Sequence, residues 1–255
     1  MNQHHSFSSI APLLLEACLQ EQSELQVAQC LSCVVNPQRA PEALSNSFER
    51  HLSNFEECDS VNSLIEGFKN AGFKKKSLSR VTAQHSDLVS VIDRKEGIPI
   101  TLAVLFITTA RKFGLTANGL NYPGHFLLQI DGLVVDPLEV EVVSDTDVVE
   151  KAQRLIASPY EIALRMLNNL KVLAFAAAEL DRALDLIDLQ LHVSSEPDTL
   201  ATLHYEKGEV WLKLQSIGSA LNAFSECLSQ ANSPQLKAHA ERKIRNLKGQ
   251  VETRH

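Results

Sequence analysis

The sequence predicts an α+β protein in two parts: a mixed part, residues 1–155, with one small antiparallel sheet, and an all-helical part, residues 156–255. Two changes in the spacing of apolar residues carry this prediction. The spacing is helical up to about residue 114, becomes alternating between Leu115 and Val143, and is helical again from Asp147 to the end. A chain of 255 residues that is 44% apolar is long enough to bury a core in each part.

Composition excludes several classes of partner. The formal net charge of -7 disfavours nucleic acid and anionic lipid, because both bind to concentrated positive charge. The first apolar run, APLLLEACL, is broken by Glu16 and follows no Lys or Arg, so neither a signal peptide nor a membrane span is expected. Five scattered cysteines, including Cys30 and Cys33, favour reduced structural thiols. We therefore expect a cytoplasmic protein that binds neither nucleic acid nor membrane.

The first part contains several short helices and one buried helix. Breaks at Pro37, Pro41 and Gly72 divide the helical spacing of residues 10–72, whereas the segment 81–94 fits no period. After Gly97, Pro99 occupies the position of a first helical residue, and an almost wholly apolar run continues to a stop at Gly114. This helix is therefore expected at the centre of the first part.

The second part carries an internal repeat of helix pairs. Gly208, Trp211, Ala220 and Phe224 have the relative spacing of the small and aromatic residues of a tetratricopeptide motif. The pattern predicts pairs at 160–178 with 180–192 and at 199–214 with 218–230, followed by a capping helix at 234–250. The alternative is a set of ordinary helical hairpins without a binding role.

The stretch GHFLLQIDGLVVDP, residues 124–137, predicts a hairpin with a two-residue turn at Asp131-Gly132. That turn pairs Ile130 with Leu133, and counting outward places His125 and Asp136 on one face as diagonal neighbours, roughly 7 Å apart. A carboxylate beside an imidazole orients and polarises it, as in the base half of a nucleophilic triad. The alternative is a structural contact that ties two strands together.

A nucleophile for this pair is expected at the start of the buried helix, where backbone N–H groups and the helix dipole lower a thiol pKa. The residues there are Gly97-Ile98-Pro99-Ile100-Thr101, and no cysteine lies between Cys58 and Cys227. Thr101 offers the nearest hydroxyl, which is a weak nucleophile without activation. Packing at the helix start is the competing role for Thr101.

Three stretches carry a resemblance to a known family: the run GIPITLAVLFITTARKFGLTANGLNYPGHFLLQ, the later DP, and RMLNNLK at Arg165–Lys171. The chain resembles the bacterial SirB family, and the likeness extends from about residue 85 to the C-terminus. The first domain of that family resembles the transglutaminase-like core of the papain-type fold. The resemblance implies that His125 and Asp136 occupy the His and Asp positions, and that the Cys position falls at or near Pro99. The chain departs from the family pattern at Leu138-Glu139-Val140, where an aromatic residue and glycines would follow.

Because the cysteine is missing, the expected function is that of a non-catalytic protein-interaction or regulatory module. Such a pseudoenzyme would bind a protein or peptide partner and would need no cofactor. The competing function is a hydrolase or acyl-transferase that uses His125, Asp136 and either Thr101 or water. A metal site built from His125, Asp136 and Glu139 or Glu141 lacks a convincing third ligand. Two further sets of residues are expected at binding surfaces: Pro99, Tyr122 and Gly124 lining a cleft, and Arg165, Asn168, Asn169 and Trp211 as interdomain or partner-binding anchors.

Overall fold

A computed structural model describes residues 4–40, 42–55, 58–74 and 80–252. The chain divides into two compact units, Met1–Leu170 and Lys171–His255. The division lies later than residue 155 because a short strand at Ile156–Ala157 pairs with the strand at Ala117–Leu120 and so belongs to the sheet of the first unit. The α+β class predicted from the sequence is confirmed, with one antiparallel sheet and a mostly helical C-terminal region.

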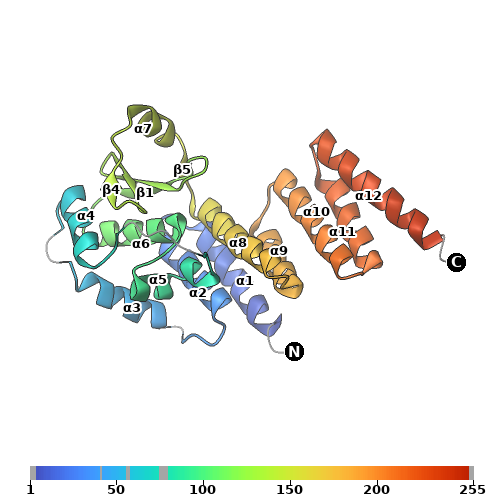
Figure 1. The fold of residues 1–255 in the computed structure, drawn as a ribbon, viewed down its shortest axis with the longest axis horizontal. Coiled ribbons are helices and arrows are strands. Elements are labelled where there is room, and N and C mark those ends of the chain that lie inside the picture. The colour runs from blue at the N-terminus through green and yellow to red at the C-terminus, as the bar shows by residue number, and fades with distance from the viewer. Residues whose placement is uncertain (1–3, 41, 56–57, 75–79, 253–255) are drawn as a thin grey trace. The chain divides into compact units, whose positions relative to one another are not determined.

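The first unit begins with helices, continues with the sheet and ends in the long helix α8 (Figure 1). Its elements are α1 (His4–Leu19), α2 (Glu24–Val35), α3 (Ala43–Leu52), α4 (Val61–Asn70), η1 (Ala83–Ser86), α5 (Leu88–Arg94), α6 (Pro99–Lys112), β1 (Ala117–Leu120), β2 (Leu127–Ile130), β3 (Leu133–Asp136), β4 (Glu141–Val142), α7 (Thr146–Ala152), β5 (Ile156–Ala157) and α8 (Pro159–Ala176).

Helix α6 is the centre of the first unit. It begins at Pro99, as predicted, because proline is preorganised for the first helical position and needs no hydrogen bond there. It ends in a Schellman motif: Gly114, at φ +80°, follows the last turn, and the Leu115 N–H donates to the Ala110 carbonyl. Buried residues lie all round α6, which contacts α2, α5, β1 and β2.

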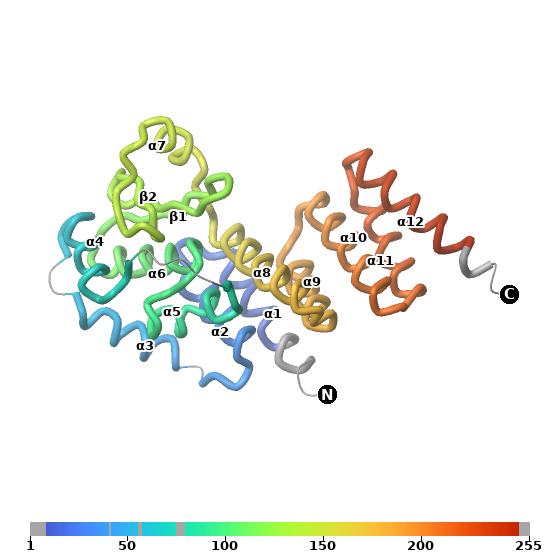
Figure 2. The backbone as a smooth tube through the Cα atoms, viewed as in Figure 1, coloured from blue at the N-terminus to red at the C-terminus, as the bar shows by residue number. Residues whose placement is uncertain are grey.

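The five strands form one antiparallel sheet in the order β4-β3-β2-β1-β5. Helix α7 covers one face, where Leu120, Leu127 and Val134 form a cluster with Ala152. Helix α6 packs against β1 and β2 on the other side, so the sheet lies between α6 and α7, as the tube in Figure 2 also shows. Strands β4 and β5 have only two residues each, too short to give a periodic signal in the sequence.

Aromatic side chains fill the space between α6 and the preceding helices. Phe68 of α4 stacks on Phe106 of α6 with ring centroids 3.5 Å apart and an interplanar angle of 7°. His51 of α3 lies within the same cluster, with its ring 5.2 Å from that of Phe68 and 5.7 Å from that of Phe73. All of these rings are buried, so this region is a densely packed core.

The second unit starts within α8 and contains α9 (Leu180–Val193), α10 (Pro197–Lys213), α11 (Ile217–Gln230) and α12 (Pro234–Glu252). These bounds agree closely with the helices predicted from the repeat. A side chain on Gly208 would meet the Phe224 ring at 2.6 Å, so the glycine permits α10 and α11 to approach closely. Ala220 is fully buried between the helices, as its small size predicts.

Candidate functional site

The hairpin that carries the candidate site has the predicted register. Asp131 and Gly132 both have positive φ, 45° and 84°, which defines a type I′ turn. Ile130 pairs with Leu133 and Leu128 pairs with Val135, as predicted. The Asp131 carboxylate accepts hydrogen bonds from the Thr116 amide and hydroxyl, at 2.8 and 2.7 Å, and these bonds lower the pKa of Asp131.

His125 lies just outside the hairpin, at the end of a tight turn. The His125 N–H donates to the Tyr122 carbonyl at 3.1 Å, Pro123 follows Tyr122, and Gly124 has φ +77°. This combination is a type II turn, in which proline and glycine occupy the positions they favour. His125 and Gly124 are exposed, whereas Tyr122 is partly buried against the sheet cluster under α7.

Arg165 of α8 holds this turn. Its guanidinium donates to the Asn121 side-chain oxygen and, at 3.2 Å, to the His125 carbonyl, and it lies 5.4 Å from the centre of the Phe126 ring. Partial burial lowers the pKa of Arg165. That Arg165 is an interdomain or partner-binding anchor stays a prediction; within the first unit its contacts fix the chain on both sides of the His125 turn.

Asp136 is occupied by the turn that follows β3. Its Oδ1 accepts hydrogen bonds from the amides of Leu138 at 2.8 Å and Glu139 at 3.2 Å. Between the described side chains of His125 and Asp136, the structure shows neither a hydrogen bond nor an ion pair. The carboxylate therefore shapes the chain after β3, and the expected orientation of the imidazole by Asp136 is not observed.

The start of α6 lies on the other side of the sheet from this carboxylate. Extending the observed register by one pair places Asp136 opposite Leu127, whose side chain belongs to the cluster under α7. Alternate residues share a face, so Asp136 is on the α7 side, whereas Leu128 and Val135 are on the side where α6 packs. The register prediction was correct, but the face it assigns to Asp136 is not the one nearest α6.

The residues at the start of α6 offer no accessible nucleophile. Pro99 is partly buried and has no reactive group. Thr101 is fully buried, and its hydroxyl makes no hydrogen bond within the described part of the chain. A hydroxyl that solvent cannot reach and that no described base contacts is not activated for attack on a substrate.

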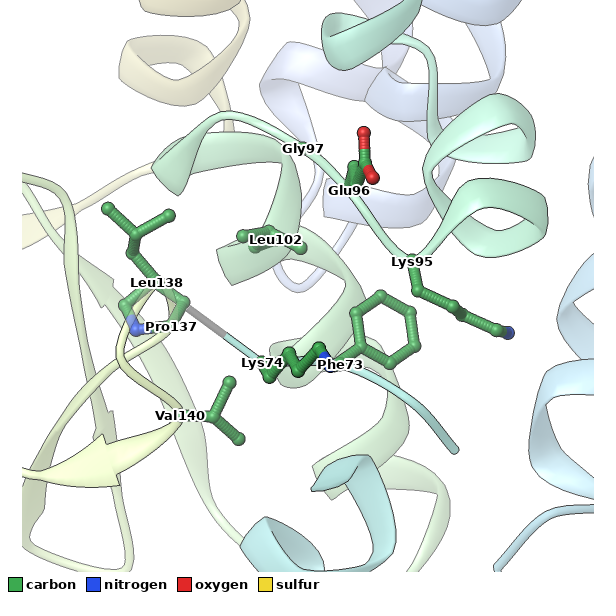
Figure 3. Close-up of a pocket in the computed structure, with 9 residues that line it drawn as sticks. All are labelled: Phe73, Lys74, Lys95, Glu96, Gly97, Leu102, Pro137, Leu138 and Val140. Carbon is green, nitrogen blue, oxygen red and sulfur yellow. The ribbon is translucent and has the colours of Figure 1, made fainter. Parts of the chain in front are cut away.

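A small pocket separates the start of α6 from the turn after β3 (Figure 3). Gly97 and Leu102 line it on the α6 side, and Pro137, Leu138 and Val140 line it on the sheet side. Its volume is about 10 Å³. Because one water molecule needs roughly 10–15 Å³ of such space, this pocket has room for a single water and not for a peptide substrate.

The charged groups beside this pocket do not form a metal centre. Lys95 lies 5.0 Å from the centre of the Phe73 ring, and burial lowers its pKa. Among the described residues, no group of three or more His, Cys, Asp or Glu side chains is placed to hold a metal ion. The sequence offered Glu139 and Glu141 as metal ligands beside His125 and Asp136. Both lie near Asp136 in sequence, but neither completes a group of three such side chains among the described residues.

A sequence profile of the transglutaminase-like superfamily matches residues 38–177, more than half of the chain. The chain belongs to this superfamily. The matched segment contains α6, the hairpin, the His125 turn and α8. Membership in this superfamily therefore agrees with the helix-and-sheet arrangement described above. The only cysteine in the matched segment is Cys58, which precedes α6 in the sequence, so the match identifies no cysteine at the start of α6.

Relatives of the chain include proteins of the UPF0162 group. The chain is 29% identical over 177 residues to a UPF0162 protein of Xylella fastidiosa strain Temecula1, covering 61% of this chain and 62% of the relative. A second, from strain 9a5c, is 28% identical over 183 residues, covering 63% and 64%. Mouse F-box only protein 21 is 31% identical over 71 residues, covering 28% and 11%. The chain thus spans less than two thirds of the two bacterial relatives. No solved structure matches it.

The remaining predicted anchors have different surroundings in this member of the superfamily. Asn168 is exposed on α8 and Asn169 is partly buried. Trp211 is half-buried inside the second unit, where it packs against clusters that include Leu184 and Phe224. Of the three, Asn168 is therefore the side chain most available for contact. Among the described residues, no helix is long and apolar enough to cross a membrane.

Proposed function

We propose that this protein is a non-catalytic member of the transglutaminase-like superfamily that acts in the cytoplasm as a protein-interaction or regulatory module. The observation that carries the proposal is the start of α6, where a catalytic thiol is expected. Pro99 stands there, the nearest hydroxyl, on Thr101, is fully buried, and the adjoining pocket has a volume of about 10 Å³. The use of Asp136 by backbone amides further supports the loss of thiol chemistry.

The helical region supports a role in binding. The spacing of Gly208, Ala220 and Phe224 resembles a tetratricopeptide motif, and the close approach of Gly208 to the Phe224 ring is the packing that such a motif requires. Together with the GIPI and PGHF motifs, this arrangement resembles the SirB family. We propose that exposed positions of α8, the first helix of the predicted repeat, provide the surface for a protein or peptide partner, and that Asn168 is one of them.

The test for catalysis uses the purified full chain. A glutamine-containing peptide is incubated with an amine donor to detect transamidation, and an activated ester is used to detect hydrolysis. We expect rates equal to the buffer blank and no change in His125→Ala. A rate above the blank that disappears in His125→Ala, and also in Asp136→Asn, would instead support the competing function, a hydrolase or acyl-transferase that uses the His-Asp pair.

A second experiment tests the interaction surface. Asn168→Glu changes an exposed residue of α8, and Asn246→Glu makes the same change at an exposed position of α12. Proteins that co-purify with the full chain are identified by mass spectrometry, and the affinity of each confirmed partner is then measured with both variants. We expect Asn168→Glu to weaken binding and Asn246→Glu to have little effect. The absence of any stable partner would contradict the proposed role.

A further inference from the structure

A groove lies between α1 and α2, in the part of the first unit that precedes the superfamily match at residue 38. Its volume is about 590 Å³, within the range of roughly 300–1,000 Å³ that is typical of small-ligand sites. The lining residues extend from Ser9 of α1 to Gln20, which directly follows that helix. At 1.5 Å per residue the groove is therefore about 16 Å long, which suits a slender molecule.

The middle of the groove is apolar. Ile10 and Ala17 are buried in its wall, whereas Leu13 is 59% exposed and presents apolar surface to the groove. Cys30 and Cys33 of α2 line the opposite wall as free thiols. Burial raises the pKa of Cys30 to about 11 and also raises the pKa of Cys33. Both thiols are therefore protonated at neutral pH and act as small apolar groups.

The end of the groove near the α1–α2 connection is polar and rich in hydrogen-bond acceptors. Glu16 is there, its Oε1 accepting a hydrogen bond from the Gln20 amide at 3.3 Å, and Gln26 of α2 lines the same end. Among the described residues, the lining contains one carboxylate and no Lys, Arg or His. An anionic group would thus face a negative charge without a compensating cation, whereas a cationic group would be paired with Glu16.

We propose that this groove binds a slender amphiphile with an ammonium head group. Its apolar chain lies along Ile10, Leu13 and Cys30, and its head group donates hydrogen bonds to Glu16 and the neighbouring amide oxygens. The site is remote in sequence from the hairpin and α6, so the inference goes beyond the proposed interaction function and does not depend on it. The length of the groove and its apolar lining favour a slender apolar chain, and the carboxylate of Glu16 favours a cationic head group.

The probes are dodecylammonium and dodecanoate, which share a chain length and differ in the charge of the head group. Each is titrated into the full chain below its micelle concentration and followed by calorimetry. We expect dodecylammonium to bind with a stoichiometry of one, at least tenfold more tightly than dodecanoate. Equal affinity for the two probes, or no binding of dodecylammonium, would overturn the proposal.

Two matched pairs of variants locate the binding site. Leu13→Ser removes apolar surface from the groove, whereas Leu19→Ser changes a leucine on the same helix that is 78% exposed and does not line it. We expect Leu13→Ser to weaken dodecylammonium binding by about fivefold or more and Leu19→Ser to leave it unchanged. Glu16→Gln should abolish the preference for the ammonium head, and Glu21→Gln, beside the groove, should retain it. Equal effects within either pair would show non-specific binding and refute the site.

Discussion

The start of α6 and the turn at Tyr122–His125 differ in what surrounds them. Thr101 is fully buried in the core and its hydroxyl forms no hydrogen bond with the described residues, whereas His125 is exposed and Arg165 binds the backbone of its turn. In an enzyme of this fold both positions would open onto one cleft. Here the start of α6 is part of the buried core, whereas the turn lies at the surface. Substitutions in the two regions should therefore differ in their effect on the free energy of unfolding.

The largest effect is expected at the stacked rings beside α6. Phe68→Ala removes a fully buried ring whose centroid is 3.5 Å from that of Phe106, and we expect a loss of about 3–5 kcal/mol in the free energy of unfolding. Far-UV circular dichroism in urea is the suitable measurement, because the single tryptophan lies in the second unit. Leu19→Ala, at an exposed site, is the control. A loss below about 1 kcal/mol would show that the α6 core is loosely packed.

A pH dependence is expected from His51 in the same core. Its Nε2 lies 3.2 Å from the Thr109 hydroxyl oxygen, which already donates to the Leu105 carbonyl, so the ring is the donor. Burial, with a smaller contribution from the charge of Lys95, lowers the pKa of His51 to about 3.

The unfolded chain therefore binds a proton below about pH 6.5 that the folded chain does not, and stability falls as pH drops from there towards about 3. Between pH 6.5 and pH 5 the loss is about 1–2 kcal/mol. Urea titrations across this range measure it, and His51→Gln, although less stable at pH 7, should show a smaller slope. An unchanged slope in the variant would assign the effect to other groups.

A smaller effect of opposite sign is expected at Thr101. Thr101→Val replaces a buried hydroxyl that lacks a described partner with a methyl group of similar size. Because an unsatisfied buried polar group costs free energy, we expect the variant to be more stable by about 1 kcal/mol. Thr109→Val, which removes a hydroxyl with two hydrogen-bond partners, should instead be destabilising. Destabilisation by Thr101→Val would mean that the hydroxyl has a partner in solution.

The smallest effect is expected at the exposed turn. His125→Ala removes an exposed ring, while Arg165 contacts the backbone carbonyl and not the imidazole, so the change in stability should lie within about 0.5 kcal/mol. Arg165→Ala, which removes the contacts to Asn121 and to that carbonyl, is the informative comparison and should cost more. If His125→Ala is the more damaging of the two, the imidazole has a structural role.

Local signals account for the parts of the fold that the sequence predicted. Pro99 and Gly114 delimit α6 because each has a backbone preference that acts within one or two residues. Asp131-Gly132 sets the hairpin register for the same reason, and the repeat gives the helices of the second unit. Strands β4 and β5 and the helix α5 were not predicted, because a segment of two to seven residues contains too few positions to define a period.

The expected site depended on more than local signals. The sequence placed His125 and Asp136 on one face of an idealised hairpin, but His125 falls in a type II turn outside the strand, and Asp136 binds the amides of the following turn. The groove between α1 and α2 was also missed. Its signal was present in the helical spacing of Ile10, Leu13 and Ala17, with Leu13 facing outward, but only the packing of α2 reveals which side stays open.

The sequence by itself determined the α+β class, the central helix, the hairpin register and the absence of a thiol at the start of α6, because each depends on residue identity or on contacts within a few positions. Only the tertiary structure decided that Thr101 is fully buried, that α6 and Asp136 lie on different sides of the sheet, and that the pocket beside Gly97 has room for no more than a single water. Burial and free volume depend on how segments distant in sequence pack together, and no local pattern records that packing.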